Sequence, residues 1–144
     1  MMRETVVLRA FEVSTLVTLA SAHLGRGDMA RATTIADEAA ALARRQGTRV
    51  FLCAANVLCA RALLARDGVR AAGDVEAILA EADQLVAQTG SRLHLPDVHL
   101  ARAELARLAG DEASRHRELR VAHRLFTEMD ATARAEQVAK ELAG

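Results

Sequence analysis

The chain has 144 residues, about the length of one domain, and its 51% hydrophobic and 26% charged residues are typical of a folded globular protein. Basic and acidic residues balance at 19 each, which argues against a dedicated nucleic-acid binder, because such proteins usually carry a basic excess. The chain has no Trp or Tyr and only three Phe, so we expect no surface that stacks bases or sugars.

Abundant alanine, a single proline and regularly placed glycines predict an all-helical chain. The glycines separate long segments in which apolar residues recur with the period of a helix, and the connections are short enough to make neighbouring helices antiparallel. The predicted helices cover residues 3–24, 29–46, 49–66, 75–89, 95–109, 112–129 and 132–142. Predicted N-cap side chains are those of Asp28, Thr48, Asp74 and Asp111, and Pro96 fits the first turn of its helix.

Residues 13–25 form the longest uncharged segment, which is too short to span a bilayer and contains several hydroxyl side chains. The N-terminal residues lack the pattern of a signal peptide. Cys53 and Cys59 are six positions apart and therefore lie on different sides of a helix. We expect two reduced core thiols, no disulfide and a cytoplasmic location.

Two short segments recur along the chain and indicate an internal repeat. Residues 46–49 resemble residues 89–92, at an offset of 43, and residues 24–28 resemble residues 107–111, at an offset of 83. Small residues recur at equivalent points of the first helices, Ala20, Ala60 and Ala103, and of the second helices, Ala39, Ala82 and Ala122. The pattern predicts a single domain, 1–144, with repeats at about 3–47, 48–90 and 91–130 and a capping helix at 131–142. The predicted apolar stripe of that last helix consists of Ala131, Ala135, Val138 and Leu142.

Residues 19–32, followed by Ala39, resemble a tetratricopeptide repeat. In that pattern the first helix carries large, large, small and aromatic positions, and a Gly-Asp turn follows at Gly27. These four positions are Leu16, Leu19, Ala20 and His23. The resemblance implies an α-solenoid whose first helices line a concave groove for a protein or peptide. The groove positions transferred from the family are Val17, Thr18, Ser21, Val57, Leu58, Arg61, Leu100, Ala101, Glu104 and Arg107.

The C-terminal third has a more specific resemblance. Residues 110–129 and 135–142 are similar to the tail of bacterial proteins with a class III nucleotide cyclase domain, an AAA-type ATPase domain and a tetratricopeptide region. Related tails end some ATPase-linked transcriptional regulators. Asp130 stands where that tail usually has glycine, so we expect a tightened or distorted turn there. The resemblance implies no catalysis in this chain.

Other motifs have ordinary structural explanations. Residues 25–30 fit G-x-G-x-x-A, but a predicted helix precedes them where a dinucleotide site needs a strand. The histidines lack the spacing that directs two imidazoles at one metal ion, and no nucleophile or acid–base motif occurs. Four carboxylates, Asp37, Glu38, Glu76 and Glu81, are expected on exposed helix surfaces. The cations of residues 112–129 form either a solvated face, the preferred interpretation, or a small anion-binding patch; they are His116, Arg117, Arg120, His123 and Arg124.

These observations predict a non-catalytic protein-interaction or scaffold module. The resemblance of the C-terminal third implies that this module is a regulatory part of a bacterial signalling or transcription-control protein. The alternative is a sensor that binds a small effector between the repeats. We expect no cofactor, no metal ion, no nucleic-acid partner and no membrane association, and we leave homo-oligomerisation open. Arg61 is expected to orient the partner, or else to pair with Glu104 inside the chain.

Overall fold

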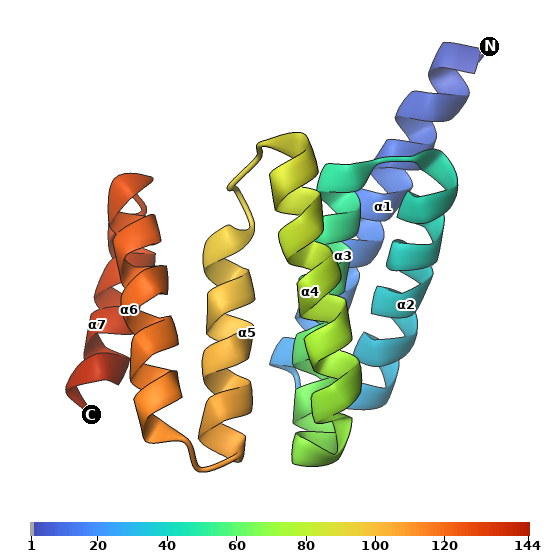
Figure 1. Ribbon diagram of the computed structural model, residues 1–144. Coiled ribbons are helices and arrows are strands. Elements are labelled where there is room, and N and C mark those ends of the chain that lie inside the picture. Colours follow the sequence, from blue (N-terminus) through green and yellow to red (C-terminus); the bar gives the residue numbers. More distant parts are fainter. Residues whose placement is uncertain (1) are drawn as a thin grey trace. The chain divides into compact units, whose positions relative to one another are not determined.

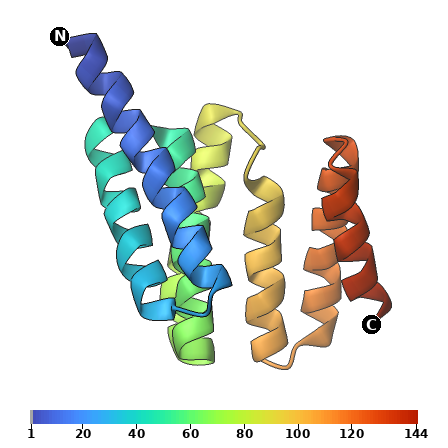
Figure 2. The same cartoon turned by 180° about the vertical axis from the view of Figure 1, so that it is seen from behind.

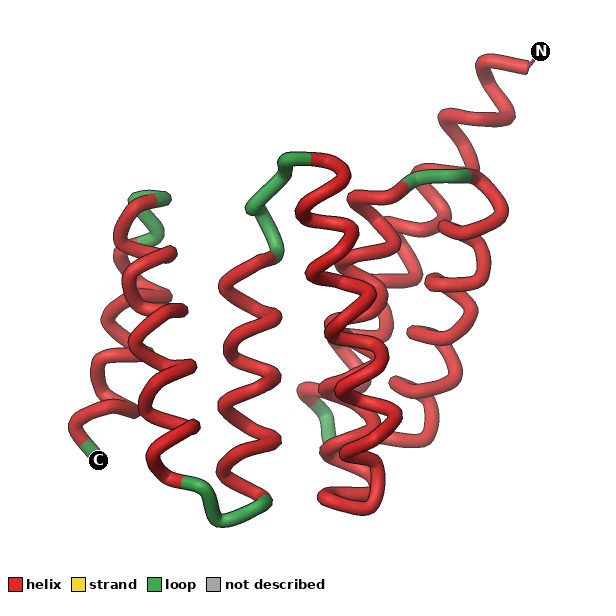
Figure 3. Tube along the Cα trace, in the orientation of Figure 1, coloured by secondary structure: helices red, strands yellow, loops and turns green. Residues whose placement is uncertain are grey.

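The computed structural model describes residues 2–144, and it describes the surroundings of side chains from residue 12 onward. Within that range the chain forms seven α-helices, one short 3-10 helix and no strand, which confirms the all-α prediction (Figures 1 and 3). The chain divides into two compact units, unit 1 (Met1–Ser91) and unit 2 (Arg92–Gly144). The division falls beside the predicted boundary between the second and third repeats.

Unit 1 is a series of antiparallel helices joined by short turns. Its elements are α1 (Met2–Gly25), α2 (Met29–Gln46), α3 (Arg49–Asp67), the 3-10 helix η1 (Gly68–Ala71) and α4 (Ala72–Thr89). Each helix packs against the next one along the chain, and α1 also packs against α3. Figure 2 shows α1 in front, with α2 beside it.

The core of unit 1 consists mainly of alanine, because small side chains let helices approach closely. The recurring alanines predicted from the sequence in this unit, Ala20, Ala39, Ala60 and Ala82, are all buried in the core. Helix α3 is buried without interruption along residues 52–60. The side chains exposed by no more than 1% are Val13, Ala20, Ala32, Ala36, Ala39, Ala43, Ala55, Ala60, Ala62, Val75, Leu79 and Ala82.

Unit 2 contains α5 (Leu95–Leu108), α6 (Glu112–Glu128) and α7 (Thr132–Ala143). Its core is a cluster made by α5, α6 and α7 and consisting of Ala103, Leu119, Ala122, Phe126, Ala135 and Val138. The predicted stripe of α7 packs on this cluster, since Ala131 and Leu142 cover its margins. Arg134 of α7 lies over the Phe126 ring, 4.6 Å from its centroid, and forms an ion pair with Asp97 of α5.

Four of the turns between helices have the same backbone geometry. A residue with positive φ ends the helix in each, at Gly27, Gly47, Gly110 and Asp130. The next backbone N–H then donates to the carbonyl five residues earlier, as in Asp28 to His23 at 2.9 Å and Ala131 to Phe126 at 2.8 Å. The turn at Asp130 is therefore not distorted, because aspartate tolerates the left-handed region better than most residues do.

The predicted helix bounds are close to the observed ones, with one clear difference before α4. The sequence interpretation left residues 68–74 as a loop, whereas η1 and the first turn of α4 occupy them. Asp74 is consequently not an N-cap but lies in the first helical turn. Asp28 and Asp111 do cap their helices, whereas the Thr48 hydroxyl donates to the Ala43 carbonyl instead. Pro96 lies in the first turn of α5 as predicted.

Candidate functional site

Six of the ten predicted groove residues lie in unit 1, on α1 and α3. Thr18, Ser21 and Arg61 are exposed, and Val17 is half-buried. The remaining two residues, Val57 and Leu58, are buried, being 5% and 7% exposed, so they leave a partner almost no surface to contact. The accessible part of the predicted surface in unit 1 is therefore polar.

Arg61 is the charged group of this accessible surface. Among the residues that the structure describes, its guanidinium makes no hydrogen bond or ion pair. An exposed guanidinium keeps five N–H donors available for a carboxylate or a backbone carbonyl. Arg61 can therefore supply a directional contact to a molecule that binds unit 1.

The other four predicted residues lie in unit 2, on α5. Ala101 is buried, Leu100 is half-buried against the unit 2 core, and Arg107 is exposed. Arg107 binds the Glu104 carboxylate through two hydrogen bonds, of 2.6 and 2.9 Å, and these bonds raise the pKa of the arginine. Glu104 and Arg107 thus neutralise each other on one turn of α5.

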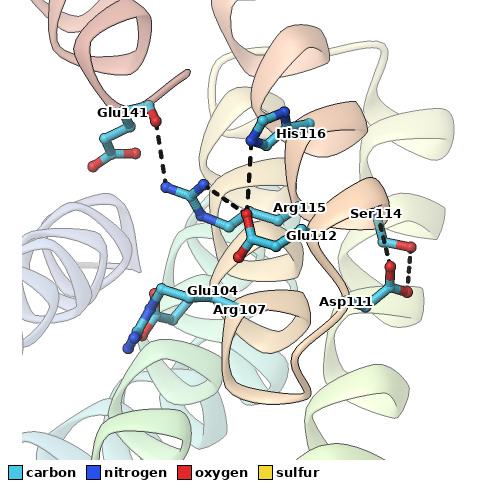
Figure 4. A network of polar contacts seen from close by, with 8 residues as sticks. All are labelled: Glu104, Arg107, Asp111, Glu112, Ser114, Arg115, His116 and Glu141. Atoms are coloured by element: carbon cyan, nitrogen blue, oxygen red, sulfur yellow. Dashed lines mark hydrogen bonds and ion pairs between the residues drawn. The ribbon is translucent and has the colours of Figure 1, made fainter. Parts of the chain in front are cut away.

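A network of polar contacts follows at the turn between α5 and α6 (Figure 4). The Asp111 carboxylate accepts hydrogen bonds from the hydroxyl and backbone N–H of Ser114, which lower the pKa of Asp111. The Glu112 carboxylate lies 3.4 Å from Arg115 and 3.7 Å from His116. Arg115 also donates to the Glu141 carbonyl, at 3.4 Å, and so joins the start of α6 to the end of α7.

The basic side of α6 is partly neutralised by its own neighbours. His116 faces Glu112, Arg117 donates to the Ser114 hydroxyl at 2.8 Å, and Arg124 lies 3.9 Å from Glu128. These contacts favour the interpretation of a solvated face over an anion-binding patch, since most of its cations already have acceptors close by.

Sequence reasoning missed a polar cluster in unit 1 that joins α2, α3 and α4. Glu81 was expected to be exposed but is half-buried. Its Oε1 accepts hydrogen bonds of 2.6 Å both from the Asn56 amide and from the Arg44 guanidinium. Asn56 is only 2% exposed and interrupts the apolar run of α3, which was the available signal, because a buried amide needs a partner.

A second missed contact joins α5 and α6 in unit 2. His99 Nδ1 lies 2.6 Å from Glu118 Oε2, and both side chains are largely shielded from solvent. Burial lowers the pKa of the nearby His94, although the charge of Asp97 opposes that shift. The two histidines therefore lie beside different carboxylates, His99 beside Glu118 and His94 near Asp97.

Among the described residues, no three His, Cys, Asp or Glu side chains lie close enough together to form a metal site.

Both cysteines are buried, as predicted, and no disulfide joins them in the part of the chain that the structure describes. Cys59 lies 3.5 Å from the Asp37 carboxylate. Burial, with a contribution from that carboxylate, raises the pKa of the Cys59 thiol to about 12. The thiol is therefore protonated near neutral pH, which is the opposite of what a nucleophilic cysteine requires.

No helix of residues 2–144 combines the length and the apolar character that crossing a bilayer requires. Two features of the surface are available for binding. They are the exposed polar groups of α1 and α3 in unit 1 and the charged turn between α5 and α6 in unit 2.

Comparisons with protein-family models, with curated proteins and with solved structures found no match to the chain.

Proposed function

We propose that the chain is a tetratricopeptide-like repeat module that binds a protein partner and carries no catalytic site of its own. The C-terminal resemblance extends the proposal to a regulatory or scaffolding role in a bacterial signalling or transcription-control protein, acting in the cytoplasm. The partner binds through the exposed groups that the first helices of the repeats present.

The recurrence of one turn geometry supports the repeat part of this proposal. The positive-φ residues Gly27 and Gly47 are separated by twenty positions, and so are Gly110 and Asp130. The two sets are related by the offset of 83 that the sequence shows. A unit of helix, turn, helix, turn and helix therefore occurs twice with the same spacing, as a repeat architecture requires.

The packing of unit 1 supports a layered arrangement of first and second helices. The first helices, α1 and α3, pack against each other, whereas the backbones of α2 and α4 do not come as close among the described residues, and the Arg44–Glu81 ion pair links these two helices. Closer packing on the side of the first helices favours a surface that curves toward them. Arg61 lies on α3, in that layer.

The observation that carries the binding function is that Arg61, in the layer of first helices, is exposed and makes no ion pair or hydrogen bond with the residues that the structure describes. An exposed charge contributes little to the stability of the fold, so its replacement separates binding from folding. We therefore expect Arg61→Glu to melt like the wild type and to weaken partner binding about tenfold or more.

The test uses the purified chain as bait, with Arg45→Glu as the matched control. Arg45 is also exposed but lies on α2, in the layer of second helices. A protein retained by the wild type and by Arg45→Glu, and lost from Arg61→Glu, supports the proposal. Equal retention by a normally folded Arg61→Glu overturns the assignment of this surface.

A further inference from the structure

One side of α1 is exposed although its sequence is not that of a solvated helix face. Five exposed residues follow one another at spacings of three, four, three and four, which places them along one line of the helix. This line, the α1 seam, consists of Glu12, Thr15, Leu19, Ala22 and Arg26. Leu19 is 44% exposed, although the repeat pattern assigns it a large, packed position.

Most of the same line on α3 is buried. Aligning Ala20 with Ala60 makes Arg26 correspond to the exposed Arg66, and it places the other four seam positions of α1 on residues of α3 that are no more than 8% exposed. These residues are Leu52, Ala55, Cys59 and Ala62. Because Cys59 contacts Asp37, this side of α3 faces the preceding helix α2. The repeat therefore builds a helix-binding face at this position, and on α1 that face is uncovered.

The middle of the seam is suited to burial against another helix. No Asp, Glu, Lys or Arg lies at positions 13–25, and the seam residues there other than Leu19 are the small Thr15 and Ala22. Beside the seam, the Thr18 hydroxyl donates to the Ser14 carbonyl at 3.0 Å, so its hydrogen bond is made within α1. Covering this surface leaves that hydroxyl satisfied, which keeps the cost of desolvation low.

The ends of the seam carry opposite charges at equal distances from its centre. Glu12 lies seven residues before Leu19 and Arg26 lies seven residues after it, about 10 Å away at each side at the helical rise. Arg26 follows α1 directly and its N–H still bonds the Ala22 carbonyl, at 3.1 Å. A second α1 running antiparallel across Leu19 would therefore meet Glu12 with an arginine at one end and Arg26 with a glutamate at the other.

We propose that two copies of this chain associate through the α1 seam, antiparallel, with the two-fold axis at Leu19. The symmetry makes the contact self-complementary: the leucines meet at the axis, and each Glu12 pairs with the partner's Arg26. A parallel pairing is disfavoured, because it would place like charges together at both ends. This association goes beyond the proposed binding of a partner and does not depend on Arg61.

The first measurement is the mass of the chain in solution as a function of concentration. The wild type forms a dimer, and Leu19→Asp raises the dimer dissociation constant at least about tenfold without changing the melting temperature. Val69→Asp is the matched control, because Val69 is another exposed apolar residue of unit 1, 49% exposed, that lies outside the seam. A wild-type chain that stays monomeric through the millimolar range overturns the proposal, as does a dimer indifferent to Leu19→Asp.

Charge reversal tests the antiparallel arrangement. Glu12→Arg and Arg26→Glu each place two like-charged pairs in a homodimer, so each variant alone dissociates more readily. An equal mixture of the two variants restores both opposite-charge pairs and forms a heterodimer. If the mixture stays as weak as the separate variants, the antiparallel pairing is wrong. If Leu19→Asp abolishes capture of another protein by a monomeric chain, the seam belongs to that protein instead.

Discussion

Helices α3 and α7 occupy equivalent positions of the repeated unit but pack against different neighbouring helices. Each follows a turn of the same geometry, at Gly47 and at Asp130, and the offset of 83 aligns their sequences. Yet α3 packs against α1, α2 and α4, whereas α7 packs on α6 and reaches α5 through single side chains. Helices at equivalent backbone positions thus pack against different neighbouring helices within the described residues.

The side chains show what makes the difference. The inner positions agree, since Leu52 and Ala55 of α3 correspond to Ala135 and Val138 of α7, and all four are buried. On the outer side, Asn56 is 2% exposed and bonds to Glu81 of α4, whereas its counterpart Ala139 is exposed. The outward faces of the two helices therefore differ within the described residues, because α4 packs on α3 there and supplies a carboxylate that matches the Asn56 amide.

Removal of α7 should have the largest effect. Truncation after Asp130 uncovers Phe126 and Leu119, which are 3% and 2% exposed in the intact unit. We expect a lower melting temperature and aggregation, because exposed apolar clusters associate. Light scattering and thermal melts measure both. Truncation after Leu142 is the control, since it leaves the cluster covered, and an unchanged melt of the longer truncation would show that α7 is a tail.

The contact between α3 and α4 has no counterpart among the helices of unit 2, and Ala82 lies inside this contact. Ala82 is fully buried, and its carbonyl lies 3.9 Å from the Cys53 thiol of α3. Ala82→Arg both overpacks this contact and buries a charge, so we expect a loss of about 3 kcal/mol or more in unfolding free energy. Denaturant unfolding measures it. Ala80→Arg on the exposed side of the same helix should cost little, and equal losses would refute the assignment of Ala82 to the repeat core.

Exchanging the outward residues of α3 and α7 sharpens the comparison. Asn56→Ala removes a hydrogen bond to a charged carboxylate, so we expect a loss of about 2 kcal/mol. Ala139→Asn introduces the same amide where nothing faces it and should cost only about 0.5 kcal/mol, from helix propensity. Denaturant unfolding of both variants gives the two values. Similar values for the two would mean that the Glu81 cluster does not hold α4 on α3.

The helix bounds were predictable from the sequence because local signals set them. Glycines that adopt positive φ and capping aspartates mark most ends, as Gly27 and Asp28 do between α1 and α2. The wrong prediction of a loop before α4 also came from local signals. Gly68 and Gly73 indicated a loop, whereas residues 68–74 form η1 and the start of α4. Local sequence signals therefore predict where a helix ends. They predict less well whether the segment between two helices is a loop or a further helical turn.

The site was less predictable because it depends on contacts between helices. Glu81 has the periodicity of an exposed residue, yet Arg44 and Asn56 reach it from two other helices. In the same way, Val57 and Leu58 were assigned to a groove by analogy and are buried in this chain. A position in a repeat pattern indicates which way a residue points along its own helix. It does not say which helix lies opposite.

The smallest expected effect concerns the two turns themselves. Asp130 adopts a φ of 58°, close to the 69° of Gly47 at the equivalent turn. A residue with a Cβ pays for the left-handed region, whereas glycine does not, although glycine loses more entropy on folding. We therefore expect Asp130→Gly to stabilise unit 2 by about 0.5–1 kcal/mol.

The reciprocal change isolates the backbone from the side chain. Gly110 has a φ of 76°, and apart from Gly110 and its two chain neighbours no residue has an atom within 4 Å of the position that a Cβ would take. Gly110→Asp therefore adds only the conformational cost and should destabilise unit 2 by about the amount that Asp130→Gly gains. Denaturant unfolding of both variants tests this. If Asp130→Gly is destabilising, the Asp130 carboxylate contributes to the last turn more than its backbone conformation costs, and the two turns are alike in geometry but not in energy.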